Sequence, residues 1–287
     1  MRTKAFVPGH ISCIFRPVRT DDVSTTGSMG FGIRLNLGCT ATVWQRDDDQ
    51  VNIFINGKRA EAPLTRSAIQ SMAPGKGFDV RLKHDLPLGQ GFGTSASGTY
   101  ASTVCVAELL GLDQKEAAIA THKTECTMGG GLGDLLAMSS EYGVPIRESP
   151  GISGITGKTS DSGLFFDNLT LIVFDEPLST ASVLSDEGMM SKIIAEGDRS
   201  MEMFRSENTI DGFFKAANTF SERTGLESEK IRRVLESIRK EGYQAGMCML
   251  GNSIYTTAPA EKMRELFPND TVVSASSYSG PIILMRC

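Results

Sequence analysis

The part of the sequence with the clearest chemistry is a run of alternating glycines that leads into two hydroxyl side chains. It spans Pro87–Ser97 and reads PLGQGFGTSAS. Glycine tolerates positive φ and has no Cβ, so neighbouring backbone N–H groups can converge on an anion. The small residues that follow predict a helix from about Ser95, whose N-terminus adds unpaired N–H donors and a positive dipole end. Each hydrogen bond to a charged phosphate contributes roughly 1.5–3 kcal/mol, so a few such donors can hold a polyphosphate.

Other interpretations of the glycine-rich segments fit less well. A plain turn before a buried helix would explain one G-x-G, but not three alternating glycines followed by adjacent hydroxyls. Gly91–Ala96 matches the G-x-G-x-x-A pattern of dinucleotide-binding domains, which requires an acid about 20 residues later, at the end of a second strand. The acids there, Glu108 and Asp113, fall in a predicted helix and at a helix cap. Gly151–Thr159 resembles a Walker A loop but has Ile152 where that pattern needs glycine.

The composition is that of a globular protein without a bulk affinity for nucleic acid. Among 287 residues, 40% are hydrophobic and 22% charged, and 29 Lys and Arg against 34 Asp and Glu give a net charge of −5. A mildly acidic chain is a poor nucleic-acid binder, although a local basic pocket for a small anion remains possible. No apolar run reaches the roughly 18 residues of a membrane span, and Pro8 and Gly9 interrupt any signal-peptide core. Six cysteines without a C-x-x-C pair favour free thiols in a reducing cytoplasm.

The pattern of apolar residues predicts an α+β chain in two lobes, 1–160 and 161–287. Residues up to about 84 are predicted as strands and turns, with Arg46–Gln50 as a solvated hairpin turn. The apolar runs that predict these strands are Thr3–Val7, Ile11–Phe15, Ile33–Trp44, Val51–Ile55 and Phe78–Leu82. Helices are predicted from about 95 to 111, after the capping box Asp113–Glu116, and briefly after Gly129–Gly131. A loop-rich connection, 143–163, ends the first lobe. The second lobe is predicted to mix helices near 188–205, 211–223, 227–241 and 259–267 with strands at 169–174, 245–255, 271–276 and 281–286. Strict β-α-β alternation is missing, which favours α+β over α/β.

These motifs resemble those of the GHMP kinases. Pro87–Ser97 is similar to that family's P-x-G-x-G-L-G-S-S-A motif, with Phe92 and Thr94 as departures, and Val7–Ser12 resembles its first motif. The third, glycine-rich motif is represented only weakly, by Gly246–Asn252. The resemblance implies a first lobe like ribosomal protein S5 domain 2 and a ferredoxin-like second lobe. It also implies an ATP-binding loop made of Pro87, Gly89, Gly91, Gly93, Thr94, Ser95 and Ala96.

One branch of the family, the archaeal pantoate kinases, is the most similar. The resemblance is carried by Pro8–Ser12, Gly27–Gly32, His122–Glu125, Gly131–Asp134 and Met247–Asn252. It implies transfer of a phosphoryl group from ATP to (R)-pantoate, giving (R)-4-phosphopantoate and ADP on a route to coenzyme A. It also implies a bound magnesium ion and a homodimer. Two alternatives stay open: another small-molecule GHMP kinase, for mevalonate, shikimate or homoserine, or a non-catalytic sensor that binds ATP.

The same resemblance assigns roles to individual residues. Asp134 is expected to accept the proton of the substrate hydroxyl, and Ser95 and Glu125 are expected to hold magnesium. A cation should face the substrate carboxylate, and His10, Ser28 and Arg147 are the expected substrate residues, with Arg34 behind them and Lys158 equally available. Each has a simpler alternative: Glu125 as a solvated surface acid, Asp134 as a helix N-cap and His10 as a turn cap.

Overall fold

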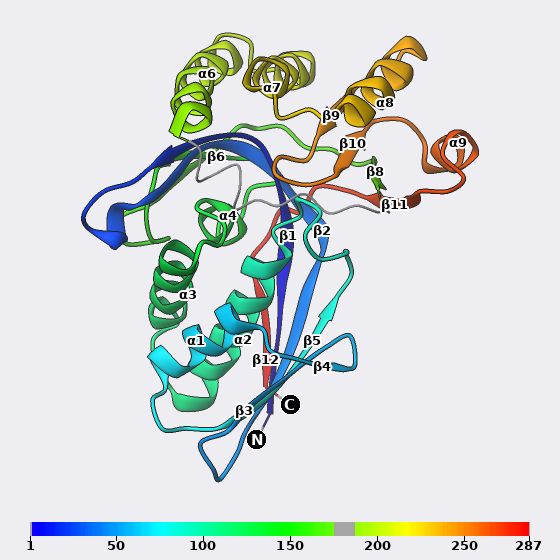
Figure 1. Ribbon diagram of the computed structural model, residues 1–287. Helices are drawn as coiled ribbons and strands as arrows, with labels where there is room; N and C mark the ends of the chain where they lie inside the picture. Colours follow the sequence, from blue (N-terminus) through cyan, green and yellow to red (C-terminus); the bar gives the residue numbers. More distant parts are fainter. Residues whose placement is uncertain (1, 175–186, 287) are drawn as a thin grey trace.

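Two long antiparallel strands, β1 (Arg2–Val18) and β2 (Gly27–Gln45), run through the centre of the molecule (Figure 1). The computed structural model describes residues 2–174 and 187–286. Two separate strands were expected in β1, at Thr3–Val7 and Ile11–Phe15, and this is wrong. The chain instead continues as one strand with register shifts at Pro8/Gly9 and Ser12/Ile14, because a bulge absorbs the proline and glycine without ending the pairing. A short 3-10 helix, η1 (Val23–Thr25), joins the two strands.

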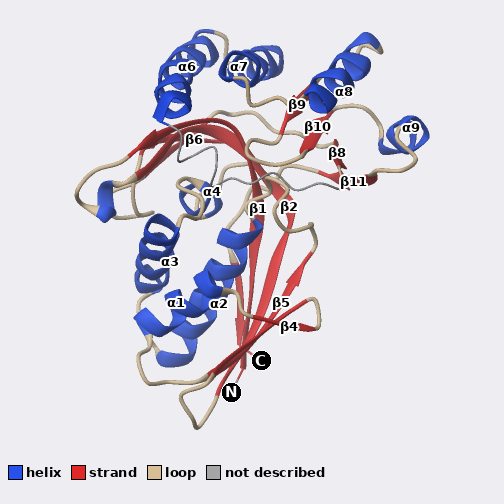
Figure 2. Cartoon of the chain, in the orientation of Figure 1, coloured by secondary structure: helices blue, strands red, loops and turns tan. Residues whose placement is uncertain are grey.

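These strands belong to an eight-stranded sheet with the order β12-β1-β2-β5-β3-β4, to which β6 and β7 add beside β2. The remaining strands of this sheet are β3 (Val51–Ile55), β4 (Lys58–Ala60), β5 (Phe78–His84), β6 (Pro145–Ser149), β7 (Lys158–Asp161) and β12 (Ile283–Arg286). One face is covered by α1 (Pro63–Met72), α2 (Thr94–Leu110) and α3 (Gln114–Met128), and α4 (Asp134–Met138) lies near its upper end (Figure 2). Because β12 pairs with β1, the two chain ends lie side by side.

Helix α1 was not expected from the sequence, where this stretch was predicted as strands and turns. Its apolar residues follow helical spacing, and Pro63 stands in the first turn, where a missing N–H is harmless. The surrounding Gly, Pro and Asn residues obscure the pattern. The error matters for function, because α1 contributes a side chain to the cavity described below.

The second sheet has the order β11-β8-β10-β9, with every neighbouring pair antiparallel. Its strands are β8 (Leu169–Val173), β9 (Ala245–Met247), β10 (Ser253–Thr256) and β11 (Thr271–Ala275), and its helices are α6 (Glu187–Ser206), α7 (Ile210–Thr224), α8 (Glu229–Lys240) and α9 (Ala260–Leu266). Numbered within the lobe, the order is 4-1-3-2, so the expected ferredoxin-like topology is confirmed. The single strand expected at 245–255 is wrong, because a turn with Leu250 at φ +60° divides it into β9 and β10. The lobe boundary at residue 160 stays a prediction.

A cluster of aromatic side chains joins the two sheets. Phe213 lies at its centre, with ring centroids 4.9 Å from Phe31 and 5.2 Å from Phe166, and it is fully buried. These rings come from β2, from the segment before β8 and from α7, so the cluster links both lobes into one core. In the part of the chain that is described, no helix is both long and apolar enough to cross a membrane.

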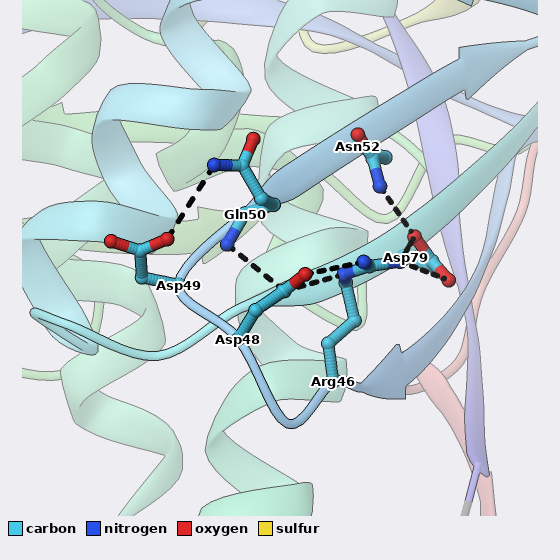
Figure 3. A network of polar contacts seen from close by, with 6 residues as sticks. All are labelled: Arg46, Asp48, Asp49, Gln50, Asn52 and Asp79. Carbon is cyan, nitrogen blue, oxygen red and sulfur yellow. Dashed lines mark hydrogen bonds and ion pairs between the residues drawn. The ribbon is translucent and has the colours of Figure 1, made fainter.

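The connection from β2 to β3 shows how the far end of the large sheet is closed (Figure 3). A hairpin was expected at Arg46–Gln50 and is wrong, because β5 lies between β2 and β3. Arg46 donates to Asp48 at 2.7 Å and to Asp79 of β5 at 3.0 Å, which ties the turn to the intervening strand. The hydrogen bond from Arg46 lowers the pKa of Asp48 to about 2. The network lies at the surface, so it fixes a local geometry rather than supplying much stability.

The aromatic cluster leads to a stability prediction. Phe213→Ala removes a fully buried ring and leaves a cavity, so unfolding should require about 3–5 kcal/mol less, measured by urea denaturation. Phe165→Ala is the matched control, because that ring is 43% exposed and should change stability by less than about 1 kcal/mol. Equal effects of the two changes would show that the cluster does not carry the contact between lobes.

Candidate active site

The glycine loop has the backbone conformation that its sequence predicts. Gly89, Gly91 and Gly93 have φ values of +73°, +82° and +60°, which side chains with a Cβ rarely adopt. Gly93 is the residue before the first turn of α2, and no side chain caps that turn. The first N–H groups of a 17-residue helix therefore point into open space beside the loop.

The second lobe holds this loop in place through Gln90. The Gln90 side-chain nitrogen donates to the carbonyl of Phe174 at 2.9 Å, and its side-chain oxygen accepts from the N–H of Asn252 at 3.2 Å. The Ser253 hydroxyl donates to the Gln90 carbonyl at 2.6 Å. The weak third motif, Gly246–Asn252, thus contains the turn that supports the glycine loop. A Cβ on Gly91 would lie only 3.1 Å from the Cα of Gly251, so the two segments need glycine to pack this closely.

A cavity of about 280 Å³ opens where the loop, α1, α2, α3, α4 and the β9–β10 turn meet. Of the expected ATP-binding residues, six line it and Pro87 does not. The lining residues are Ser12, Phe15, Ser28, Leu64, Gly89, Gly91, Phe92, Gly93, Thr94, Ser95, Ala96, Glu125, Gly129, Gly130, Gly131, Leu132, Gly133, Asp134, Met249 and Leu250. In this set the charged side chains are two carboxylates, so the attraction for a polyphosphate must come from backbone N–H groups, a bound cation or charges behind the wall.

Glu125 is buried at the cavity wall and is no solvated surface acid. Glu125 is 1% exposed, although it lies near the end of α3. One carboxylate oxygen accepts from the Ser95 hydroxyl at 3.5 Å, and the other accepts from the N–H of Gly131 at 2.7 Å. Burial raises the pKa of Glu125 to about 7 in the absence of a cation. A Cβ on Gly130 would lie 2.2 Å from this carboxylate, so the glycine cluster after α3 folds directly around it.

The hydroxyl and carboxylate of Ser95 and Glu125 are the donor set that a hard cation prefers. The described ranges 2–174 and 187–286 contain no group of three or more His, Cys, Asp and Glu side chains that could hold a metal by themselves. A magnesium ion bound here would therefore complete its coordination with phosphate oxygens and water, which is how magnesium is commonly held beside nucleotides. The side chains present fit that ion.

Asp134 faces the end of the glycine loop. A Cβ on Gly93 would lie 3.2 Å from its carboxyl carbon, so the carboxylate and the N-terminus of α2 share one wall of the cavity. The alternative of helix N-capping is wrong, because Gly133 is the N-cap of α4 and Asp134 is the first helical residue. Its carboxylate instead contacts His10, whose Nδ1 lies 2.8 Å from Oδ1 of Asp134. The Asp134 side chain is 21% exposed, which leaves it open to a substrate.

The expected substrate residues fall into two groups. Ser28 lines the cavity, whereas His10 and Arg147 are fully buried behind Asp134. Arg147 donates to the carbonyl of Ile14 at 3.0 Å and lies 3.3 Å from His10 Nε2. A direct contact of His10 or Arg147 with a substrate carboxylate stays a prediction.

Arg34 and Lys158 lie away from the cavity. The Arg34 guanidinium donates to four backbone carbonyls, those of Met138, Tyr142, Tyr278 and Gly280, and so ties β2 to two distant loops. Lys158 is exposed on β7 and does not line the cavity. Sequence reasoning missed several apolar lining residues. Leu64 was hidden with α1, and Phe15, Leu132, Met249 and Leu250 carry no chemical signature, so only the folded structure brings them together.

Comparison with known proteins agrees with this geometry. The family model described as "GHMP kinases N terminal domain" matches residues 60–141. The pantoate kinase of Thermococcus kodakarensis is 31% identical, over 93% of this chain and 92% of its own length. That of Methanospirillum hungatei is 29% identical, over 99% and 96%. A solved structure titled "Phosphotransferase related to CoA biosynthesis pathway" is 26% identical, covers 100% of this chain and 99% of its own, and superposes with a TM-score of 0.89.

More distant structures share the fold. Lactococcus lactis galactokinase, at 13% identity, covers 98% of this chain and 95% of its own with a TM-score of 0.69. The fold, the glycine loop and the match to the pantoate kinases over more than nine-tenths of the chain agree with one another. This chain belongs to the GHMP kinases and, within them, to the pantoate kinase family.

The buried carboxylate yields a prediction about stability and pH. Folding raises the pKa of Glu125 from 4.5 to about 7, so its ionisation destabilises the fold by an amount that grows between those pH values and is complete above pH 7. The shift corresponds to about 3 kcal/mol. Glu125→Gln should therefore stabilise the metal-free protein by up to about 3 kcal/mol near pH 8 and by little near pH 4.5, measured by urea denaturation.

The matched control is Glu116→Gln, an exposed residue in the first turn of the same helix, which should show no such dependence on pH. A Glu125→Gln protein whose stability relative to wild type is the same at both pH values would mean that the folded protein leaves this carboxyl with an ordinary pKa.

Proposed function

We propose that this protein transfers the γ-phosphoryl group of ATP to the primary hydroxyl of pantoate, giving 4-phosphopantoate and ADP in coenzyme A biosynthesis. The observation that carries the proposal is the approach of the Asp134 carboxylate to the end of the glycine loop, where helix α2 begins. The names of the relatives identify pantoate as the acceptor. The wider family supports ATP as the donor.

Different residues of the cavity have different roles in phosphoryl transfer. The N–H groups of residues 89–95 hold the phosphates of ATP and stabilise the charge that spreads over the transferred group. Asp134 orients the pantoate hydroxyl and accepts its proton. The hydroxyl oxygen forms a bond to the γ-phosphorus as the bond from that phosphorus to the β–γ bridging oxygen breaks, so ADP leaves with the electron pair. Magnesium, held by Ser95 and Glu125, would neutralise charge on the phosphate oxygens.

The cavity lining offers both apolar and polar groups to the proposed acceptor. Phe15 and Leu132 offer apolar surface for the two methyl groups of pantoate, and Ser28 offers a hydroxyl for its polar end. A reducing, cytoplasmic location is supported by the free thiols of Cys13, Cys39, Cys126 and Cys248. A homodimer stays a prediction.

A substrate panel tests the proposed function. Purified protein with ATP and magnesium should release ADP with (R)-pantoate and not with mevalonate, shikimate or homoserine, and mass spectrometry should detect 4-phosphopantoate. Turnover of mevalonate without turnover of pantoate would replace the proposal with another kinase activity. Binding of ATP without turnover of any acceptor would favour a sensor.

The proposed role of Asp134 leads to a second prediction. Asp134→Asn keeps the size of the side chain and removes the proton acceptor, so kcat should fall about 10²–10⁴-fold while the affinity for an ATP analogue changes little. Asp161→Asn, an exposed change on β7, is the control and should keep kcat. If Asp134→Asn keeps full turnover, another group accepts the proton.

The cation site can be tested without reference to Asp134. Ser95→Ala removes one of the two proposed oxygen donors, so the magnesium concentration for half-maximal activity should rise about tenfold or more. Ser102→Ala on the same helix is the control, because that hydroxyl donates to the Gly98 carbonyl within α2. An unchanged magnesium requirement in both Ser95→Ala and Glu125→Gln would remove these two residues from the site.

A further inference from the structure

Arg147 is a buried cation without an anionic partner in contact. It is fully buried, and among the described residues no carboxylate lies within 4.0 Å of it. Its two hydrogen-bonding partners are the Ile14 carbonyl and His10 Nε2, and its Nε has none. Burial lowers the pKa of Arg147 to about 10, so the guanidinium remains charged at neutral pH. A buried charge without a contacting counter-ion is unfavourable for folding, and its presence here points to an effect on a neighbouring group.

The group that it serves is identified by the hydrogen bonds of His10. A guanidinium can only donate, so His10 Nε2 must present its lone pair to Arg147 at 3.3 Å. The imidazole proton is then on Nδ1, where it is donated to Asp134 Oδ1 at 2.8 Å. Burial lowers the pKa of His10 and the charge of Arg147 acts in the same direction, so a neutral ring is expected at neutral pH. Through these two hydrogen bonds, Arg147 fixes the orientation of the His10 ring, and the ring fixes the orientation of the Asp134 carboxylate.

The surroundings leave this chain of hydrogen bonds little freedom to move. A Cβ on Gly32 would lie 2.4 Å from His10 Nε2, and a Cβ on Gly30 would lie 2.9 Å from the guanidinium of Arg147. Both glycines belong to the Gly27–Gly32 segment, which the rest of the site does not explain. The N–H of His10 also donates to the Phe92 carbonyl at 3.0 Å, so the same residue contacts the phosphate loop and the carboxylate.

From this geometry we propose that Arg147 and His10 are positioning residues: they form a relay, Arg147 to His10 Nε2 and His10 Nδ1–H to Asp134 Oδ1, that leaves Asp134 Oδ2 as the oxygen that takes the substrate proton. This proposal rests on the proposed function. Oδ2 lies on the side of Gly131, whose Cβ would come within 2.4 Å of it, and Gly131 lines the cavity.

The first test reads the protonation of His10 directly and does not depend on activity. The chain has three histidines, so ¹H–¹⁵N correlation spectra of the imidazoles can be assigned with His84→Gln and His122→Gln. Near neutral pH, His10 should be a single neutral tautomer with its proton on Nδ1. In Arg147→Met the second tautomer should appear. A proton on Nε2, or a doubly protonated ring in the wild type, would overturn the proposal.

The second test separates positioning from substrate binding by kinetics. His10→Gln and Arg147→Met should lower kcat with pantoate about 10²-fold or more and change its KM less than about threefold. His10→Asn, whose amide can occupy the place of Nδ1, should restore kcat to within about tenfold of the wild type. A rise in KM of about tenfold with kcat preserved would show instead that these residues bind the substrate carboxylate. Equal losses in His10→Asn and His10→Gln would also contradict the relay.

The outcomes distinguish the relay from the proposed function. If the wild type fails to phosphorylate pantoate, the proposed function is wrong, and the spectra still decide the relay. If Arg147→Met fails to fold, which melting curves would reveal, the comparison of His10→Asn with His10→Gln decides it.

Discussion

The structure depends on one constraint: the N-terminus of α2 must point into the cavity from the middle of the protein. This is possible because α2 is built of small residues and is buried along most of its length. A Cβ on Gly98 would lie 3.0 Å from the ring of His84 on β5, so the helix and the sheet approach as closely as backbone allows. With no room to tilt, the helix fixes where its free N–H groups point, and every other part of the site is arranged around them.

The second lobe contributes support rather than chemistry. Gln90 lies between Gly89 and Gly91. Its side-chain nitrogen, side-chain oxygen and backbone carbonyl form hydrogen bonds with Phe174, Asn252 and Ser253. These contacts replace the rigidity that glycines lack, because positive φ values alone leave a loop many alternative conformations. The degenerate third motif is thus understandable in physical terms. The motif has to form a tight turn that packs against the glycine loop, and Leu250, with a φ in the left-handed region, allows that turn.

The sequence predicted those features of the site that depend on neighbouring residues in the chain, and missed those that depend on distant segments. The conformation of the glycine loop could be predicted because glycine spacing and a helix start are local features, and both lie where they were expected. The burial of Glu125 could not be predicted, because the local sequence of a carboxylate late in a helix is the same whether a glycine cluster or water covers it. Helix α1 was missed for a related reason: its apolar spacing is short and its flanks are those of loops.

The two buried arginines show that residue type alone does not determine the role of a side chain. Arg34 and Arg147 were both candidates to face a substrate carboxylate, and both are fully buried. Arg34 is surrounded by four carbonyl oxygens, which accept hydrogen bonds from both of its terminal nitrogens and make it a structural cross-link. Among residues 2–174 and 187–286, Arg147 donates to a carbonyl and an imidazole, and the carboxylate of Asp134 lies on the other side of the His10 ring. The difference lies in the acceptors that the fold supplies, and these come from segments more than a hundred residues away in the chain.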